Sequence, residues 1–231
     1  MTLLSRRNLL RGGTTAALAV AGGTAAYETR SSTPAPSPSP AAVPKPTFSA
    51  TPVSARVRLQ QQHLPNVPLI THEGVPVRLY DDLVKDKIVT INFFYTGCTD
   101  ICPTVTANLA ATQTLLGDQV GRDIFMYSFT LNPEWDDVNA IRHYREAFKA
   151  GPGWTFLTGK PEDIEKLRRA IGFRLPDPAK DQDKEQHIGN IRYGNEPLML
   201  WAACPGMAHP KYIAETLGWM IRPNTSRIQP A

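Results

Sequence analysis

Two cysteines four positions apart carry the clearest chemistry in this 231-residue sequence. Cys98 and Cys102 follow the apolar run 88–95, and Cys102 immediately precedes Pro103. Proline is favoured at the first position of a helix, so we expect a strand-to-helix junction here, with Cys102 at the helix N-cap. The free amides and dipole of a helix N-terminus favour a thiolate, which is both a nucleophile and a soft metal ligand. The pattern therefore indicates redox or soft-metal chemistry.

The spacing limits what the pair can do. Side chains at positions i and i+4 of a regular helix have Cβ atoms about 5–6 Å apart, whereas a disulfide needs roughly 3.5–4.5 Å. If Cys98 lies in the loop before the helix, a disulfide and a shared metal ion are both open, because two sulfurs on one ion lie roughly 4 Å apart. Two buried structural cysteines are the remaining alternative.

The small number of cysteines argues against a fold built on disulfides. The chain has three, and the third is Cys204. We expect Cys204 to be a buried thiol, with an extra redox or metal partner as the alternative. In an oxidising compartment, the metal-free pair Cys98 and Cys102 is expected to form an intramolecular disulfide.

The elements around the cysteines alternate in pattern. Residues 88–95 are β-branched and aromatic and almost continuously apolar, which predicts a buried central strand. Further strand patterns occur at 67–70, 76–79, 124–131, 154–157, 188–193 and 198–202, and helix patterns occur after Pro103 and at 136–148, 162–171 and 211–219. The helical segment 136–148 should turn Val138, Ile141 and Ala147 inward. Alternating strands and helices indicate an α/β layer architecture with parallel pairing.

The sequence before the predicted domain has the features of an export signal followed by a linker. Residues 1–26 contain the pair Arg6-Arg7 before a weakly apolar stretch, as in a twin-arginine export signal. That stretch falls short of the roughly 20 apolar residues of a membrane span, so the signal is either cleaved or retained as an anchor. An Arg-rich start before a soluble helix is the alternative. Residues 27–60 form a Pro/Ser/Ala-rich linker, 61–222 the domain and 223–231 a tail.

The net positive charge of the chain comes mainly from the predicted export signal. The formal net charge is +4, but residues 1–26 contain three arginines and no acidic residue. The remainder is close to neutral and gives no electrostatic reason to expect nucleic-acid binding. The expected location is periplasmic or otherwise exported, with membrane contact only through a retained N-terminal anchor.

The cysteine loop also resembles a known family. Residues 93–104, Phe-Phe-Tyr-Thr-Gly-Cys-Thr-Asp-Ile-Cys-Pro-Thr, resemble the signature loop of the Sco/SenC copper chaperones. Residues 128–134 resemble the family's S-x-D-P-x turn, with Asn132 in place of Asp, and 154–159 resemble its W-x-x-L-T-G strand. The similarity covers about 67–218. It implies a thioredoxin-like α/β domain with a central mixed β-sheet flanked by helices.

The resemblance also implies copper held by the two loop cysteines and one distant histidine. His187 matches the place of that ligand, and a Cys₂His set suits copper. The sequence departs from the family on either side of it, where Gln186 and Ile188 replace the usual Asp and small hydroxyl residue. His209, near Cys204, is the alternative ligand. The remaining histidines are expected near the linker, in a hairpin turn and on a solvated helix face: His63, His72 and His143.

Two functions follow from these residues. The first is a metallochaperone that carries copper to the dinuclear copper centre of cytochrome c oxidase, with the copper-bearing subunit or a similar copper protein as its partner. The second is a periplasmic thiol-disulfide oxidoreductase that uses Cys98 and Cys102, with a thiol reductant as partner; thiol peroxidase is a weaker third. His187 discriminates between the first two, because dithiol exchange needs no imidazole. Thioredoxin-type reductases also usually have the shorter Cys-x-x-Cys spacing.

Overall fold

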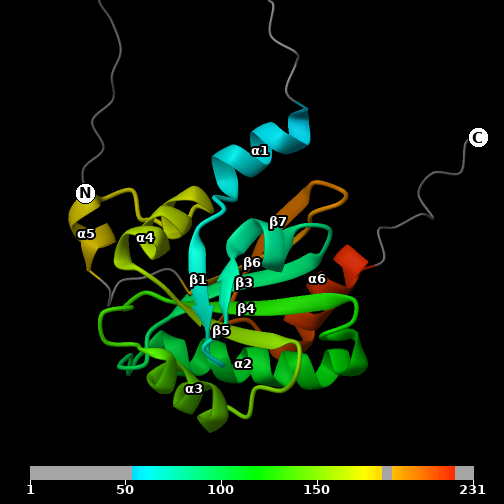
Figure 1. Cartoon of the computed structure of the whole chain (residues 1–231). Helices are drawn as coiled ribbons and strands as arrows, with labels where there is room; N and C mark the ends of the chain where they lie inside the picture. The colour runs from blue at the N-terminus through cyan, green and yellow to red at the C-terminus, as the bar shows by residue number, and fades with distance from the viewer. Residues whose placement is uncertain (1–53, 184–188, 222–231) are drawn as a thin grey trace, which may run out of the picture. The chain divides into compact units, whose positions relative to one another are not determined.

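The computed structural model describes residues 54–183 and 189–221. The predicted export signal, most of the predicted linker, His187 and the predicted tail lie outside the described residues. In the described part, one seven-stranded sheet has the order β2-β1-β5-β4-β3-β6-β7 (Figure 1). Its strands are β1 (Pro68–Thr71), β2 (Pro76–Arg78), β3 (Ile88–Phe94), β4 (Ile124–Thr130), β5 (Trp154–Thr158), β6 (Asn190–Asn195) and β7 (Leu200–Pro205).

The sheet is mixed, as the family resemblance implied. Strands β3, β4 and β5 run parallel, whereas β1 pairs antiparallel with β5, and β6 pairs antiparallel with β3. The β1–β2 and β6–β7 pairs are antiparallel hairpins at the two edges. The parallel pairing predicted from the alternation therefore holds for the three central strands, and the hairpins add the antiparallel ones.

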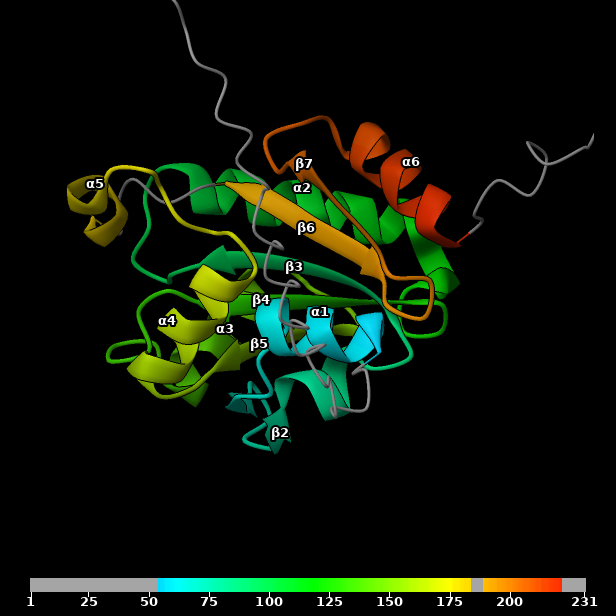
Figure 2. The same cartoon turned by 90° about the horizontal axis from the view of Figure 1, so that it is seen from above.

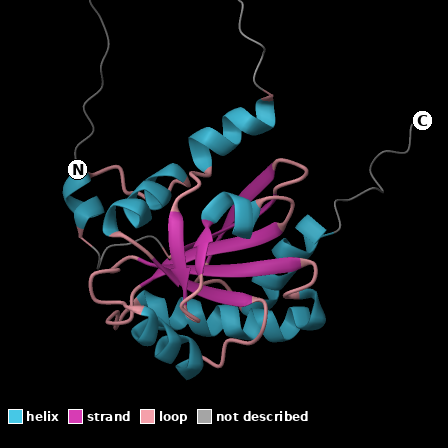
Figure 3. Cartoon of the chain, viewed as in Figure 1, coloured by secondary structure: helices cyan, strands magenta, loops and turns pink. Residues whose placement is uncertain are grey.

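Helices cover both faces of the sheet (Figures 1 and 3). They are α1 (Ala55–His63), α2 (Ile101–Leu116), α3 (Val138–Ala147), α4 (Pro161–Ala170), α5 (Pro178–Gln182) and α6 (Pro210–Ile221), with a π-helical turn at Leu79–Val84 and a 3₁₀ turn at Gly117–Gln119. The core between the sheet and α2, α3 and α6 contains Leu109, Ile141 and Leu217. The second core, toward α4, contains Ile91, Ile164 and Leu167. No helix in the described ranges is long and apolar enough to cross a membrane.

Helix α3 differs from the sequence prediction at one position. Ile141 is fully buried and Val138 is half-buried, but Ala147 is exposed. Tyr144 turns inward instead, and its ring stacks on Phe94 with the centroids 4.8 Å apart. Tyr144 lies three residues after the buried Ile141 and therefore on the same face of the helix, which faces the core.

Helix α1 was not predicted, and it is held by charge. None of its side chains is buried. Arg56 donates two hydrogen bonds, at 2.7 and 2.6 Å, to the buried carboxylate of Glu196 in the β6–β7 turn. The same carboxylate accepts from the Tyr80 hydroxyl and from the Asp86 amide, each at 2.9 Å. Burial raises the pKa of Glu196, but these hydrogen bonds outweigh it and hold the pKa below its ordinary value.

We predict that Glu196→Gln lowers the free energy of unfolding by about 1–3 kcal/mol at neutral pH, because buried donors lose a charged acceptor. A depressed carboxyl pKa stabilises the fold above the unfolded pKa of about 4.3 and loses that contribution as pH falls through the folded pKa. The difference between the native and Glu196→Gln proteins should therefore shrink in acid. Denaturant unfolding from pH 7 to 3 measures it, with the exposed Glu146→Gln as control. A difference that grows toward pH 3 would contradict the assignment.

Candidate metal and redox site

The two cysteines lie where β3 passes into α2. β3 ends at Phe94, and Cys98 lies in the connecting loop, with its amide donating to the Tyr95 carbonyl at 3.2 Å. Cys98 is 6% exposed and Cys102 is 1% exposed, and the structure holds both as thiols. Their side chains are hydrogen-bonded to each other. The loop position of Cys98 is the condition under which the sequence left both a disulfide and a shared metal ion open.

The predicted N-cap position of Cys102 is wrong. Helix α2 begins at Ile101 with Asp100 as its N-cap, so Cys102 is the second helical residue and Pro103 the third. No amide N–H in the first turn of a helix has a hydrogen-bond partner within the helix, so proline, which has no N–H, is tolerated at any of these positions. Pro103 therefore indicates the first turn but not which residue begins it.

The pKa values of the two thiols are shifted in opposite directions. Burial raises the pKa of Cys102, and its hydrogen bond with Cys98 raises it further. Burial also raises the pKa of Cys98, but hydrogen bonds from Cys102, from the Asp100 backbone and from the Tyr95 side chain outweigh it and leave the pKa lowered. The thiolate is therefore favoured at Cys98 rather than at the predicted Cys102. A thiolate is the nucleophilic form of cysteine, so Cys98 is the more reactive of the two sulfurs.

Asp136 holds the cysteine loop and was missed by the sequence reasoning. It is 1% exposed and accepts hydrogen bonds from the amide of Thr96 at 3.1 Å and from the hydroxyls of Thr96 and Thr130. It thereby joins the loop after β3 to the end of β4. Asp136 lies just after the segment 128–134, which resembles the family turn. Its partner Thr96 is 40 residues away in the sequence. Nothing local in the sequence signals that contact.

Tyr144 closes the site from the side of α3. Its hydroxyl hydrogen-bonds with Thr106 of α2 at 3.1 Å, and its ring contacts Phe94, Phe148 and Phe156. Burial raises the pKa of Tyr144, and negative charge on the nearby thiols would raise it further. The phenol therefore stays neutral, and its ring adds to the aromatic cluster of the core that also contains the two cysteines.

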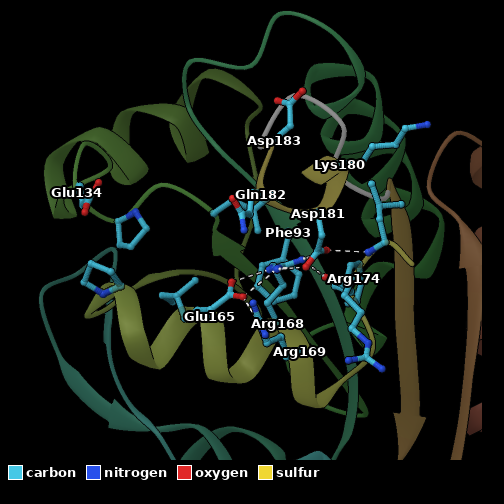
Figure 4. Close-up of a pocket in the computed structure, with 16 residues that line it drawn as sticks. Phe93, Glu134, Glu165, Arg168, Arg169, Arg174, Lys180, Asp181, Gln182 and Asp183 are labelled. Atoms are coloured by element: carbon cyan, nitrogen blue, oxygen red, sulfur yellow. Dashed lines mark hydrogen bonds and ion pairs between the residues drawn. The ribbon is translucent and has the colours of Figure 1, made fainter. Parts of the chain in front are cut away.

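Arg168 fixes the chain before the segment that contains His187. Its guanidinium donates to both carboxylate oxygens of Asp181 in α5, at 2.7 and 2.8 Å, and to Glu165 at 2.8 and 2.9 Å. Figure 4 shows Arg168 between these two carboxylates. They line a cavity of about 280 Å³ beside Phe93 of β3 and Leu131 after β4. These ion pairs thus connect α5 to α4 near the carboxyl ends of β3 and β4, where the cysteine loop also begins.

The chain after His187 lies close to the cysteines. The carbonyl of Gly189 accepts from the Gly206 amide at 2.8 Å. A Cβ atom at Gly189 would lie 2.9 Å from Cδ1 of Ile101, the residue next to Cys102. The structure therefore places position 189 against the first turn of α2. His187 itself, two residues earlier, lies outside the described residues.

The other histidines do not meet the thiols. His209 is exposed, and its Nδ1 accepts from the Lys211 amide at 3.2 Å. His72 is buried, and its Nδ1 accepts from the Phe156 amide at 3.4 Å. Burial and Arg145 lower the pKa of His72, so its ring is neutral. His63 lies 3.3 Å from the Ala170 carbonyl, and His143 is exposed on α3, as expected.

Cys204 is buried on the same side of the sheet. It is 3% exposed, lies opposite Ile191 in the β6–β7 ladder, and belongs to the core shared with Cys98 and Cys102. Burial raises the pKa of Cys204, as fits the buried thiol expected from the sequence. Among residues 54–183 and 189–221, no group of three or more His, Cys, Asp or Glu side chains is arranged to hold a metal ion.

We predict that Asp136→Asn lowers the free energy of unfolding by about 1–3 kcal/mol, because an amide oxygen replaces a carboxylate that accepts three hydrogen bonds at a buried position. The variant should also change the alkylation rate of Cys98, since Thr96 would no longer be held. Denaturant unfolding and mass-mapped alkylation measure the two effects. Glu134→Gln, exposed in the same loop, is the control. Equal behaviour of the two variants would show that Asp136 does not position the loop.

Comparison with known proteins places this geometry in a family. Residues 58–192 match the SCO1/SenC family model. The chain is 30% identical over 133 residues to the mitochondrial protein SCO1 homolog 1 of Arabidopsis thaliana, a match that covers 57% of this chain and 39% of that protein. It is 31% identical over 124 residues to protein sco1 of Schizosaccharomyces pombe, covering 52% and 46%. The match spans less than half the length of either relative.

The fold agrees with these matches. The crystal structure of Arabidopsis thaliana ScoI with copper bound superposes with a TM-score of 0.55 at 23% identity, covering 68% of this chain and 96% of that one. The predicted thioredoxin-like architecture, with a mixed sheet flanked by helices, is thereby confirmed. Because the family model spans more than half of the sequence and includes the whole cysteine loop, this chain belongs to the SCO1/SenC family.

Proposed function

We propose that this protein binds copper through Cys98, Cys102 and His187 and delivers it to the copper-bearing subunit of cytochrome c oxidase or a similar copper protein. The observation that carries the proposal is the pair of buried, mutually hydrogen-bonded thiols at the start of α2. Two adjacent sulfurs in a buried, partly aromatic site suit a soft ion such as Cu(I). Family membership and a copper-bound solved structure of similar fold support the choice of metal.

The position of Gly189 supports His187 as the third ligand. Two residues of extended chain span about 7 Å at most, and Gly189 lies against Ile101 at the thiol pair. An imidazole at position 187 therefore has the reach to meet the two sulfurs. His209, the alternative ligand, is exposed at the start of α6, where its Nδ1 already accepts a backbone hydrogen bond.

A copper ion would be held by both sulfurs as thiolates. Its charge favours loss of the two thiol protons, because a coordinating thiol is deprotonated by the metal. Release to an acceptor runs in the opposite direction, with incoming ligands replacing the sulfurs while the protein regains its protons.

The lowered pKa of the Cys98 thiol also supports a second function, thiol-disulfide exchange. The Cys98 thiolate would attack a disulfide in a copper protein, which forms a mixed disulfide and releases one thiolate of the target. Cys102, deprotonated, would then attack Cys98, form the internal disulfide and release the second thiol of the target. An external thiol reductant must restore the pair. Both functions can coexist, because a cysteine-based copper site must be reduced before it is loaded.

We predict that His187→Ala weakens Cu(II) binding at least tenfold and abolishes thiolate-to-copper charge-transfer absorption, because imidazole serves the harder ion. Cu(I) binding should fall less, while Cys98→Ala or Cys102→Ala should impair binding of both ions. Disulfide exchange by His187→Ala should persist, since it needs only an accessible thiolate. Copper titration with absorption spectroscopy and a disulfide reductase assay measure these effects.

The matched control is His209→Ala, which should bind both copper ions as the native protein does. If His187→Ala leaves Cu(II) binding and oxidase assembly unchanged while either cysteine variant destroys assembly, the ligand role of His187 fails. The reductase function would then take precedence over the chaperone.

We further propose that the chain is exported as a folded protein through a twin-arginine signal within residues 1–26. The motivation is the pair Arg6-Arg7 before a weakly apolar stretch. Replacing both arginines with lysine keeps the charge, so it should leave the protein in the cytoplasm only if the arginine pair is read specifically. Cell fractionation measures this outcome. Unchanged export of the double-lysine variant would contradict the assignment.

A further inference from the structure

A second cavity lies on the face of the sheet opposite the cysteines. Its volume is about 680 Å³, and it opens between α1, the loop after α4 and the β6–β7 hairpin. Figure 2 shows α1 on one side of β3 and β6, with α2 and α6 on the other. A ligand in this groove would leave Cys98 and Cys102 free, because they belong to the core beneath α2.

The floor of the groove is apolar and includes an exposed aromatic ring. Ile91 of β3 and Trp201 of β7 both line it. Trp201 is 38% exposed and lies directly over Gly194, since a Cβ atom there would be only 2.3 Å from the indole. Leu59 of α1, 40% exposed, forms part of the opposite wall. Partly exposed tryptophans in such hollows are the side chains that most often contribute strongly to protein–protein binding.

The rim carries positive charge without matching acids. Arg56 is paired with Glu196 and Asp86. Among the described residues, neither Arg174 nor Arg192 has a carboxylate partner. Arg192 reaches from β6 over the Phe173 ring and donates to the Gly172 carbonyl at 3.3 Å, while its Nε is buried with no hydrogen-bond partner. Two guanidinium groups thus border an apolar floor without a counter-charge.

We propose that this groove binds an extended acidic segment of a partner protein, a function separate from copper binding. Its carboxylates would pair with Arg174 and Arg192, whose planar donors match a carboxylate. An apolar side chain of the segment would pack against Trp201. The chain's own Pro-rich residues 31–53 do not fit this charge pattern, since they contain Lys45 and no acidic residue. A flat membrane surface would not reach a floor recessed between α1 and the hairpin.

The test uses the full chain and a fluorescein-labelled octapeptide of alternating Glu and Phe, with fluorescence anisotropy as the readout. The native protein should bind this peptide, and Arg174→Glu should weaken binding about tenfold or more. Arg174 is exposed and has no ion pair among the described residues, so the variant should fold. The matched control is Arg58→Glu, an exposed arginine on α1 outside the groove lining. It should change the affinity by less than about twofold. Added salt should weaken the native complex.

Several outcomes would overturn the proposal. One is absence of binding to the acidic peptide, and another is equal binding of an octapeptide of alternating Lys and Phe. Equal effects of Arg174→Glu and Arg58→Glu would show nonspecific charge attraction. The protein is also tested on vesicles of equal phosphatidylglycerol and phosphatidylcholine. If it binds them, if Arg174→Glu abolishes this binding and if the peptide does not compete with it, the groove is assigned to a lipid surface. Sedimentation as a dimer that Arg174→Glu dissociates would assign it to a second copy. Copper titration of the same variants, expected to be unchanged, separates this inference from the copper proposal.

Discussion

The geometry of the site depends on one buried carboxylate. Asp136 accepts the amide and hydroxyl of Thr96 and the hydroxyl of Thr130, and so fixes the cysteine loop to the end of the neighbouring parallel strand. Parallel β3–β4 pairing brings the two strand ends together, but it does not determine the path of the chain beyond them. A carboxylate at 1% exposure is tolerated only where its lone pairs are satisfied. The loop conformation and the burial of Asp136 therefore require each other.

A similar arrangement holds the opposite end of the strands. Glu196, also 1% exposed, gathers Arg56, Tyr80 and the Asp86 amide, and so attaches α1 to the β6–β7 turn. The sheet and its two apolar cores set the shape of the domain. The two buried acids then select among the loop paths that this shape allows, because a misplaced donor would leave each of them unpaired. Glu196 helps to keep α1 beside the hairpin and so contributes to one wall of the groove.

The strands and most helices could be predicted from periodicity, because each is read from its own residues. Residues 88–95, for example, predicted β3 to within one residue. Helix α1 could not be predicted, since it buries no side chain and is held by a glutamate 140 residues away. Tyr144 was missed because its inward position depends on Phe94, in a distant strand.

The candidate site was predictable in its cysteines and less so in its details. Residue types alone identified Cys98 and Cys102, but the polarity of the pair depends on tertiary contacts. Cys102 is more deeply buried than a helix start suggests, and Tyr95 supplies a hydrogen bond to Cys98 that the sequence does not announce. Asp136 gave no signal because its partners come from two separate places, the loop after β3 and the end of β4.

The placement of one sulfur in a helix and the other in a loop has a mechanical consequence. Cys102 is fixed by the first turn of α2, whereas Cys98 lies between the restrained Thr96 and the N-cap Asp100. The separation of the sulfurs therefore depends on the short segment 97–99 rather than on the sheet. In the copper function proposed above, the same pair would close to a covalent bond when metal-free and move apart to hold an ion. The accompanying change of structure would stay within that one segment.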